Sequence, residues 1–461
     1  MKLKIYSPYD RSEIGEVNTN STQETEKMLA RAYALYRDHD SWLDKDTRIK
    51  ILEKLAFLLE AEKEERAIQI AKEGGKPLVD ARIEASRAVE GVRLAEHELQ
   101  KWHPEEIPMG LNAASQGRKA TAIREPIGVV VALSAFNHPL NLIIHQVIPA
   151  VATGCPIIIK PASATPFSCI RLVELLKKAG LPDGWCQLCI CDNKTAEKLA
   201  TDPRVGFLSF IGSAKVGWML RSKLAPGTRC ALEHGGVAPV IVEKDADIEK
   251  AIPLLVKGGF YHAGQVCVSV QRIYAHESIA EDFARKLAEK AKKMVVGDPV
   301  AENTDIGPLI DPREVERVDS WVKEAIDAGA KCLCGGKKLS ETTYAATVLL
   351  NPTDNAKIST EEVFGPVVCV YSYKDRLKAI EMANSLPYAF QAAVFTKNKK
   401  IAEDTVRRLD ATAVMVNDHT AFRVDWMPFG GRRQSGLGLG GIGYTMHDMT
   451  QIKMTVERTD G

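Results

Sequence analysis

The sequence predicts an α/β protein in which helices cover a doubly wound, mostly parallel sheet. Apolar segments of strand length alternate with amphipathic helices between residues 127 and 212, and a second alternating set begins near residue 237. This alternation is typical of βαβ units, whose consecutive strands pair in parallel. With 461 residues, the chain is long enough for two or three domains with large cores.

The N-terminal part of the chain is predicted to be helical. Apolar residues recur three and four positions apart over 22–63 and 64–102, as on one face of a helix. The polar, glycine-containing stretch 109–126 resembles an exposed hairpin.

The first alternating set contains four predicted strands. They lie in IGVVVALSA (127–135), CPIIIKPA (155–162), WCQLCICD (185–192) and VGFLSFIG (205–212). The helices between them are predicted to end at Gly154 and at Gly180, since glycine is favoured just past a helix C-terminus.

The second set predicts another α/β domain. Its strands are expected in 238–247, 271–276, 366–373 and 391–396, and its helices in 248–262, 278–295 and 312–329.

Composition excludes several classes of protein. The 61 Lys and Arg residues nearly balance 60 Asp and Glu, so no overall field favours nucleic acid or anionic lipid. The start of the chain has no apolar signal region, and no apolar run reaches the length of a membrane span. Ten cysteines without a secretory signal indicate a reducing compartment, so we expect a cytoplasmic protein that binds neither nucleic acid nor membrane.

Two cysteine clusters could suggest a metal. Cys186, Cys189 and Cys191 form one, and Cys332 and Cys334 the other. A structural zinc site needs four ligands, and no histidine pair completes either cluster. We therefore predict buried strand cysteines and no metal.

Three polar residues indicate chemistry at a carbonyl group. Cys267 lies in the small-residue segment 258–272, Glu233 in LEHGG and Asn137 in AFNHP. A single cysteine is more often a small buried hydrophobe. Together, however, a thiolate can add to a carbonyl carbon, an amide can hold the oxyanion, and a carboxylate can activate water.

A phosphate site is predicted in FIGSAKVGWML (210–220), where a strand ends at Gly212 and Ser213 can cap the following helix. The C-terminal GLGLGG (436–441) also fits a dinucleotide fingerprint, but it follows no strand and too little chain remains for a βαβ unit. We interpret it as a flexible loop near the active site.

Over essentially its whole length, the chain resembles the aldehyde dehydrogenase superfamily, nearest the lactaldehyde and phosphonoacetaldehyde dehydrogenase branches. The matching segments, in the family's order and spacing, are AFNHP (135–139), IIIKPASATP (157–166), FIGSAKVG (210–217), LEHGG (232–236), GQVC (264–267), EEVFGP (361–366) and PFGG (428–431).

The resemblance implies a fold of three parts and a homodimer or homotetramer. A Rossmann-type cofactor domain would span 1–107 and 127–235, and an α/β catalytic domain 236–434. A β oligomerisation element would comprise 108–126 and 450–459.

The resemblance also implies roles for the three polar residues. Cys267 would form a thiohemiacetal with an aldehyde, and the Asn137 amide and the Cys267 backbone N–H would hold its oxyanion. After hydride transfer to NAD or NADP, Glu233 would activate water to hydrolyse the thioester. Because a free thiol has a pKa of about 8.5, the site or the cofactor is expected to favour thiolate.

The cofactor residues implied by the resemblance come from three of the matching segments. They are Lys160, Ser163, Gly212, Ser213, Val216, Glu362 and Phe364. Ser163 stands where NAD-specific members usually have glutamate, which would repel a 2′-phosphate, so NADP is somewhat favoured.

Three further positions depart from the family pattern. His234 lies beside the base in place of leucine, while Gln146 and Gly440 replace a lysine and a glutamate that serve proton relay in some members.

The substrate is expected to be a short, polar or anionic aldehyde. His138, Asn141 and His145 recur three and four residues apart after the oxyanion asparagine, and Arg423 lies where the family lines its substrate entrance. Such side chains can hold a carboxylate, phosphonate or sulfonate, although they could equally be structural or solvated. Val266 stands where some anionic-aldehyde members have arginine.

Two alternatives differ in function. A CoA-acylating semialdehyde dehydrogenase often lacks the base at the Glu233 position, so the presence of Glu233 argues against it. A catalytically silent relative would not need Cys267, Asn137 and Glu233 together.

Overall fold

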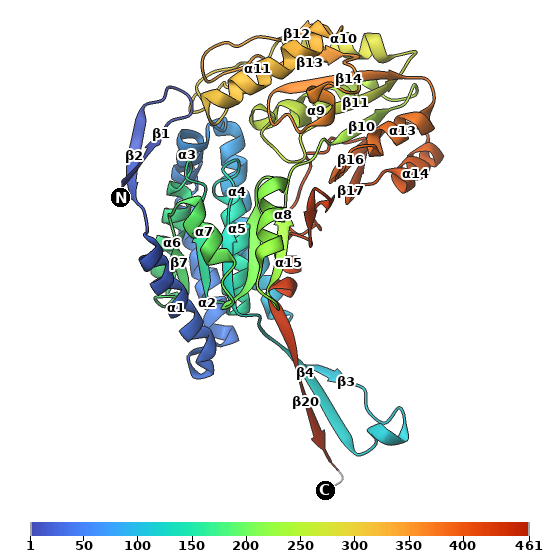
Figure 1. The fold of residues 1–461 in the computed structure, drawn as a ribbon. Helices are drawn as coiled ribbons and strands as arrows, with labels where there is room; N and C mark the ends of the chain where they lie inside the picture. The colour runs from blue at the N-terminus through green and yellow to red at the C-terminus, as the bar shows by residue number, and fades with distance from the viewer. Residues whose placement is uncertain (1, 460–461) are drawn as a thin grey trace.

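Two helix-covered sheets and a projecting β arm make up the molecule (Figure 1). The computed structural model describes residues 2–459. The first body contains a six-stranded sheet in the order β19-β9-β8-β5-β6-β7. Its strands are β5 (Val129–Leu133), β6 (Ile157–Lys160), β7 (Cys186–Leu188), β8 (Val205–Ile211), β9 (Arg229–Glu233) and β19 (Gly436–Leu437). Strands β5 to β9 are parallel, and the order reverses between β5 and β8, where α/β sheets bind ligands at the strands' carboxyl ends.

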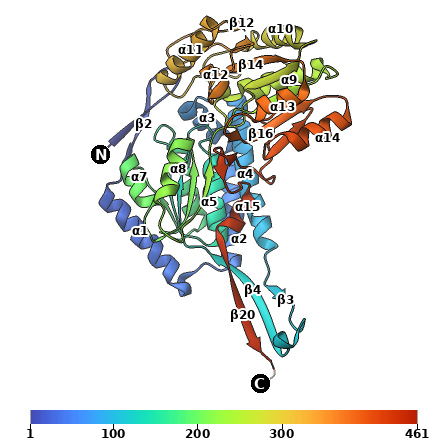
Figure 2. The ribbon, with the colours of Figure 1, turned by 45° about the vertical axis from the view of Figure 1, so that its right-hand side comes forward.

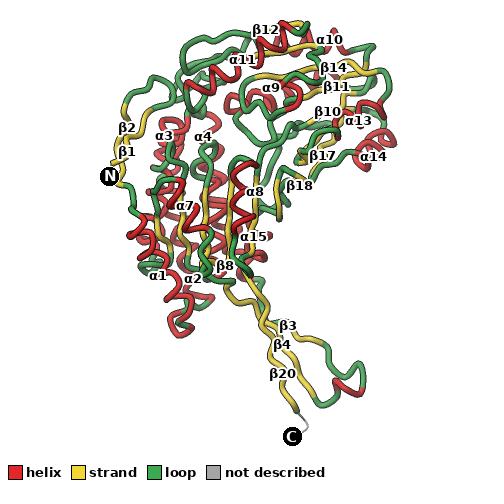
Figure 3. The backbone as a smooth tube through the Cα atoms, viewed as in Figure 1, coloured by secondary structure: helices red, strands yellow, loops and turns green. Residues whose placement is uncertain are grey.

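Helices cover both faces of this sheet, as Figure 3 shows. They are α1 (Thr22–Arg37), α2 (Lys45–Ala61), α3 (Lys63–Gly74), α4 (Leu78–Gln100), α5 (Asn141–Thr153), α6 (Phe167–Ala179), α7 (Asn193–Ala200), α8 (Ala214–Lys223) and α15 (Ile442–Asp448). One apolar core packs α2 to α6 and α15 on one face, and a second packs α1, α7 and α8 on the other. The predicted helix ends are confirmed, since Gly154 and Gly180 are left-handed at φ 79° and 106°.

The second body contains a seven-stranded sheet in the order β12-β13-β14-β11-β10-β16-β17. Its strands are β10 (Pro239–Val242), β11 (Arg272–His276), β12 (Lys331–Cys334), β13 (Thr347–Leu350), β14 (Val367–Tyr373), β16 (Gln391–Phe395) and β17 (Ala413–Val416). Its helices are α9 (Ile248–Phe260), α10 (Ala280–Ala291), α11 (Pro312–Asp327), α12 (Lys357–Thr360), α13 (Arg376–Asn384) and α14 (Lys399–Arg408). The edge strand β12 is antiparallel and the other six strands are parallel.

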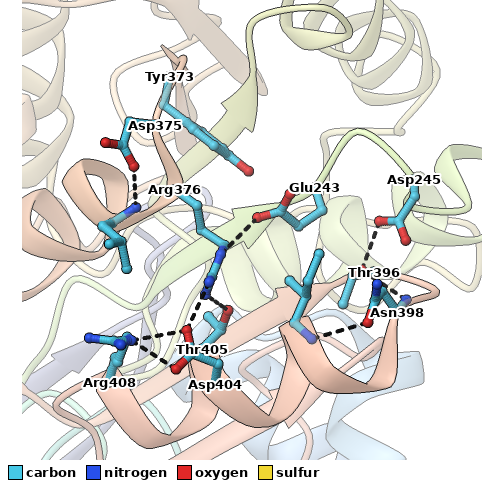
Figure 4. Close-up of polar contacts among 12 residues, drawn as sticks. Glu243, Asp245, Tyr373, Asp375, Arg376, Thr396, Asn398, Asp404, Thr405 and Arg408 are labelled. Atoms are coloured by element: carbon cyan, nitrogen blue, oxygen red, sulfur yellow. Dashed lines mark hydrogen bonds and ion pairs between the residues drawn. The ribbon is translucent and has the colours of Figure 1, made fainter.

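A polar network ties α13 and α14 to this sheet (Figure 4). Arg376 donates to the Asp404 carboxylate at 2.8 Å and to the Thr405 hydroxyl at 2.9 Å, and lies 3.8 Å from Glu243, which follows β10. Arg408 also donates to Asp404, at 2.9 Å. Every member of this cluster therefore has a structural partner.

The projecting arm is a three-stranded antiparallel sheet that leaves the first body, as Figure 2 shows from a second side. It consists of β3 (Glu105–Ile107), β4 (Arg118–Pro126) and β20 (Thr450–Arg458) in the order β20-β4-β3. Only the second half of the expected hairpin is strand, and β20 pairs with all of it from Thr450–Pro126 to Arg458–Arg118. One face of β20 exposes Ile452, Met454 and Val456 by 64%, 54% and 48%.

Short elements complete the described chain: β1 (Lys2–Tyr6), β2 (Glu13–Asn18), β15 (Tyr388–Ala389), β18 (Arg432–Arg433), and single turns at His39–Ser41, Ala113–Ser115 and Tyr261–Gly264. No helix within residues 2–459 combines the length and the apolar character needed to cross a bilayer.

Three sequence-based expectations need correction. Cys332 is exposed, because β12 is an edge strand with an irregular register between Cys332 and Cys334. The strand expected over 185–192 is limited to β7, three residues long. The GLGLGG segment is not simply a flexible loop, since β19 pairs with β9 and Gly440 pairs with Phe429.

Candidate active site

A cavity of about 1280 Å³ lies where the strand ends of the first body face loops of the second. Its lining includes most of the predicted site residues: Asn137, His138, Asn141, His145, Lys160, Gly212, Ser213, Val216, Glu233, Cys267, Glu362, Phe364 and Arg423. Lys160 ends β6, Glu233 ends β9, and Gly212 follows β8, so one edge of the parallel sheet supplies many of these side chains. Ser163 is exposed and lies outside this lining.

Asn137 is held against the segment that carries the cysteine. Its side-chain amide donates to the backbone carbonyl of Gln265 at 2.9 Å, and the residue is 7% exposed. An amide nitrogen has two N–H donors. One N–H of the Asn137 amide therefore binds Gln265, two residues before Cys267. The second N–H is left to donate to an oxygen atom beside Cys267.

The turn before Cys267 has an unusual backbone. His262, Ala263 and Gly264 all have positive φ, at 48°, 54° and 71°. The Gln265 side chain fixes this turn, donating to the Pro308 carbonyl at 3.2 Å and accepting from the Ile310 N–H at 2.9 Å. Strained turns of this kind persist where surrounding contacts over-determine them, as they do at active sites.

Burial raises the pKa values of the acidic groups in the cavity. It raises the pKa of Glu233 to about 7 and that of Glu362 to about 8. Burial, followed by the neighbouring Glu233 and Glu362, raises the pKa of Cys267 well above its usual value, and Arg423 opposes this. The protein's own side chains therefore favour the thiol, so of the two expected sources of thiolate, the site and the cofactor, these side chains are not one.

The sheet edge also fits a dinucleotide. Ser213 is the N-cap residue of α8, but among the described residues its side chain accepts no hydrogen bond from that helix, contrary to the predicted cap. The first turn of α8 therefore faces the cavity with N–H groups that can bind phosphate. Lys160 lies at the strand end on the same cavity wall, and Glu362 accepts from the Gly236 N–H at 3.2 Å.

His234 stabilises the turn between β8 and α8 and does not face its neighbour Glu233. Its Nδ1 donates to the Gly212 carbonyl at 2.8 Å, and the residue is 2% exposed. The ring packs at steep angles against Phe210 and Trp218. The imidazole therefore links the end of β9 to the segment that precedes α8.

A buried carboxylate that the sequence analysis missed organises the other end of the cavity. Asp425 accepts from Arg87 Nε at 3.1 Å and Nη2 at 2.6 Å, and lies 2.7 Å from His145 Nε2. Asn141 also donates to it, at 3.4 Å. The predicted substrate residues Asn141 and His145 are therefore partly engaged by the protein itself.

His138 is also a weak candidate for binding an anion. Burial lowers its pKa well below the usual value, with the nearby Lys76 contributing, so the ring is neutral. Its Nε2 lies 3.4 Å from the Tyr261 hydroxyl.

Arg423 is the predicted substrate residue that retains both charge and hydrogen-bonding capacity. Its guanidinium lies 3.6 Å over the Phe429 ring, and its Nε is 3.7 Å from Asp425. In the described part of the chain, its buried Nη1 has no hydrogen-bond partner. Because Arg87 and Arg423 share the single carboxylate of Asp425, this end of the cavity carries excess positive charge.

Comparison with known proteins identifies relatives along the whole chain. The model of the aldehyde dehydrogenase family matches residues 1–455. A 3-sulfolactaldehyde dehydrogenase from Priestia aryabhattai is 38% identical over 456 residues, which cover 99% of this chain and 94% of the relative. The predicted family and the lactaldehyde-like branch are confirmed.

Two solved structures are similar throughout. Aldehyde dehydrogenase 21 from Physcomitrella patens, in complex with the reaction product succinate, is 33% identical with a TM-score of 0.96, covering 100% of this chain and 96% of that one. Glyceraldehyde-3-phosphate dehydrogenase from Methanocaldococcus jannaschii, complexed with NADP, is 35% identical with a TM-score of 0.94, covering 99% of both chains. These similarities confirm the predicted α/β fold class.

Proposed function

Because the chain belongs to the aldehyde dehydrogenase family, we propose that Cys267, Glu233 and Asn137 oxidise a short anionic aldehyde to its carboxylic acid. This chain is an NAD(P)-dependent aldehyde dehydrogenase, and the short, polar or anionic substrate and the residue roles are the proposed part. The observation that carries the proposal is the convergence of these three side chains, from three separate segments, on one cavity.

In the first half-reaction, the Cys267 sulfur bonds to the aldehyde carbon. The Cys267 N–H and the second N–H of the Asn137 amide hold the resulting oxyanion. The thiol gives up its proton to solvent in the open cavity as the sulfur attacks, so Glu233 is not required in this half-reaction. A bound nicotinamide would supply the hydride acceptor, next to Glu362 and Phe364.

In the second half-reaction, water attacks the thioester carbon while Glu233 takes a proton from it. The carbon–sulfur bond breaks, Cys267 departs as the thiolate, and the carboxylic acid is released. With a pKa of about 7, Glu233 is partly ionised near neutral pH and can act as this base.

The anionic substrate is supported by the charge of the cavity wall. Arg423 presents an unpaired buried N–H, and Arg87 adds a second guanidinium behind it. A desolvated arginine forms strong hydrogen bonds to carboxylate, sulfonate or phosphate oxygens. The relatives named above act on a sulfonated or phosphorylated aldehyde or release a dicarboxylate, in keeping with this assignment.

For the cofactor, either NAD or NADP fits, and we propose that NADP is preferred. Ser163 carries no carboxylate to repel a 2′-phosphate. In the cavity lining, Lys194 and Lys198 outnumber the neighbouring Glu197 and leave a net positive charge.

The three-part division of the chain, a homodimer or homotetramer, and a cytoplasmic location remain proposals. The arm supports the oligomer, because its exposed Ile452, Met454 and Val456 form an apolar strip on a sheet that pairs within the chain. The ten free cysteines support a reducing compartment.

A turnover screen tests the proposal. Short aldehydes that differ only in a terminal carboxylate, sulfonate, phosphonate or methyl group are assayed with NAD and with NADP, with and without CoA. The proposal expects reduced cofactor, faster turnover of the anionic aldehydes and no requirement for CoA. Faster turnover of the neutral aldehydes would refute the substrate class. A requirement for CoA would favour a CoA-acylating semialdehyde dehydrogenase. If no aldehyde is turned over, a catalytically silent relative would be favoured.

A further inference from the structure

A buried ion pair lies close to both segments that supply the proposed oxyanion donors. Lys76 is in the turn that joins α3 to α4, and its Nζ contacts the carboxylate of Glu84 on α4. The two side chains are 0% and 1% exposed, and both lie outside the lining of the active-site cavity. Desolvation offsets most of the attraction within such a pair, so a contribution to stability does not by itself account for it.

Glu84 holds the start of α5, the helix that follows the loop of Asn137. Its Oε1 atom accepts from the backbone N–H groups of Leu140 and Asn141 at 2.9 Å and 3.0 Å. The first N–H groups of a helix have no partner within that helix, and the apolar side chain of Leu140 at the N-cap position provides none. The Glu84 carboxylate therefore anchors the backbone directly after the Asn137 loop.

The end of α3, next to the turn that carries Lys76, packs against the same loop. A Cβ atom added to Gly74 would lie 3.6 Å from Pro139 Cγ and 3.8 Å from the Phe136 carbonyl oxygen. Phe136 directly precedes Asn137, and Pro139 follows it by two positions. The loop that carries the amide donor is thus held on the α3–α4 turn both by packing and by the Glu84 carboxylate.

The α3–α4 turn also contacts the segment that fixes the turn before the cysteine. Gly75 has a φ of 71°, and a Cβ atom there would lie 2.8 Å from Pro308 Cγ. The carbonyl of Pro308 accepts from the Gln265 side chain at 3.2 Å, and the carbonyl of Gln265 accepts from the Asn137 amide at 2.9 Å. The turn that carries Lys76 therefore reaches the bond between the two donor segments from both of its ends.

Lys76 is placed to hold this arrangement together. Its Nζ lies 5.8 Å from the centre of the ring of Tyr261, the first residue of the turn before Cys267, while it contacts Glu84. We propose that the Lys76–Glu84 pair positions the two proposed oxyanion donors, by fixing the α3–α4 turn against both segments that carry them. Both residues act through the backbone as positioning residues, and the inference rests on the proposed role of the Asn137 amide.

Three variants and one control test the pair. Glu84→Gln keeps the shape of the side chain and an oxygen for the α5 N–H groups, but removes the partner charge of Lys76. Lys76→Met removes the charge from the other side, and the double variant leaves neither charge unpaired, so it remains testable if a single variant does not fold. Glu73→Gln is the matched control, because the buried Glu73 accepts from the Phe167 and Ser168 N–H groups at 2.7 Å and 2.9 Å, at the start of α6.

Two cofactor-free reactions of Cys267 differ in whether they need an oxyanion hole. Iodoacetamide alkylates the sulfur by displacement of iodide at a saturated carbon, and the thiol proton goes to solvent, so no oxyanion forms. 4-Nitrophenyl acetate is attacked at its carbonyl carbon, passes through an oxyanion and then expels 4-nitrophenolate. Rapid mixing measures the burst of 4-nitrophenolate, and mass spectrometry of the Cys267 peptide follows alkylation. A general structural defect should slow both reactions, whereas misplaced donors should slow acylation alone.

We expect Glu84→Gln and Lys76→Met to slow acylation about tenfold or more, while alkylation stays near the wild-type rate. The burst of reduced cofactor with an anionic aldehyde should slow by a similar factor. The double variant should recover part of the loss but not all of it, and Glu73→Gln should match the wild type in both reactions. Because the pair acts through Asn137, Glu84→Gln should slow an Asn137→Ala enzyme much less than it slows the wild type.

Three results would overturn the positioning role of the pair. They are equal slowing of alkylation and acylation, acylation at the wild-type rate in the variants, and a loss in Glu84→Gln that is as large in the Asn137→Ala enzyme as in the wild type. Wild-type acylation by Asn137→Ala itself would instead refute the oxyanion role of Asn137 in the proposed function, so the two failures are distinguishable.

Discussion

Replacement of Arg423 by methionine should convert substrate selectivity without abolishing catalysis. The substitution keeps the apolar contact with Phe429 but removes the guanidinium, whose buried Nη1 is free to bind an anion. A hydrogen bond to a charged group contributes about 1.5–3 kcal/mol, which corresponds to about a tenfold to hundredfold loss in kcat/KM for an anionic aldehyde. At pH 9, a neutral aldehyde of equal length should lose little.

The same variant should change the pH dependence of deacylation. Burial raises the pKa of Glu233 to about 7, and Arg423 acts in the opposite direction. Without this cation the pKa rises further, and because the ionised carboxylate is the base, activity on a neutral aldehyde should be lost at pH 6 and retained at pH 9. Arg423→Lys, which keeps the charge, is the control.

Steady-state kinetics on paired anionic and neutral aldehydes across pH 5.5–9.5 measures both effects. Equal losses on the two substrates would show that Arg423 is structural. An unchanged or lowered pH midpoint would show that its charge does not reach Glu233.

Three further substitutions test other parts of the account. Ser163→Glu should lower kcat/KM for NADP about tenfold relative to NAD, because a carboxylate repels the 2′-phosphate; an unchanged ratio would place cofactor choice elsewhere. Asp425→Ala leaves Arg87 without its buried partner and should lower the free energy of unfolding in urea by about 3–5 kcal/mol, whereas a change no larger than that of the half-exposed Asp418→Ala would contradict this. Ile452→Glu in β20 should yield smaller oligomers or monomers by light scattering, and an unchanged mass at micromolar concentration would exclude the exposed arm face as an interface.

Local sequence patterns predicted most of the parallel strands and the residues at their ends. Lys160 ends a strand whose apolar run is continuous, so its place at the sheet edge follows from the pattern. The strand β9, which ends at Glu233, was not predicted, because its sequence RCALE begins with an exposed arginine and is only partly buried. Cys267 and Asn137, the proposed nucleophile and oxyanion donor, lie in recognisable motifs of their own.

The missed residues depend on contacts between distant segments. Arg87 lies on α4, 338 positions from Asp425. In the sequence it cannot be distinguished from an arginine on a solvated helix face. The available signal for Asp425 was its position two residues after Arg423. That Arg87 and Arg423 both contact the Asp425 carboxylate is visible only in the fold. The bonds of His145 and Asn141 to this same carboxylate were hidden for the same reason.

The most direct test of the central claim is the pre-steady-state burst of reduced cofactor in Glu233→Gln and Cys267→Ala. If the thiol acts in the first half-reaction and the carboxylate activates water in the second, Glu233→Gln should give a burst near one equivalent per active site followed by slow turnover. Cys267→Ala should give neither burst nor turnover. A Glu233→Gln enzyme whose hydride transfer is itself slow and burst-free, or a Cys267→Ala enzyme that still oxidises aldehyde, would contradict the account.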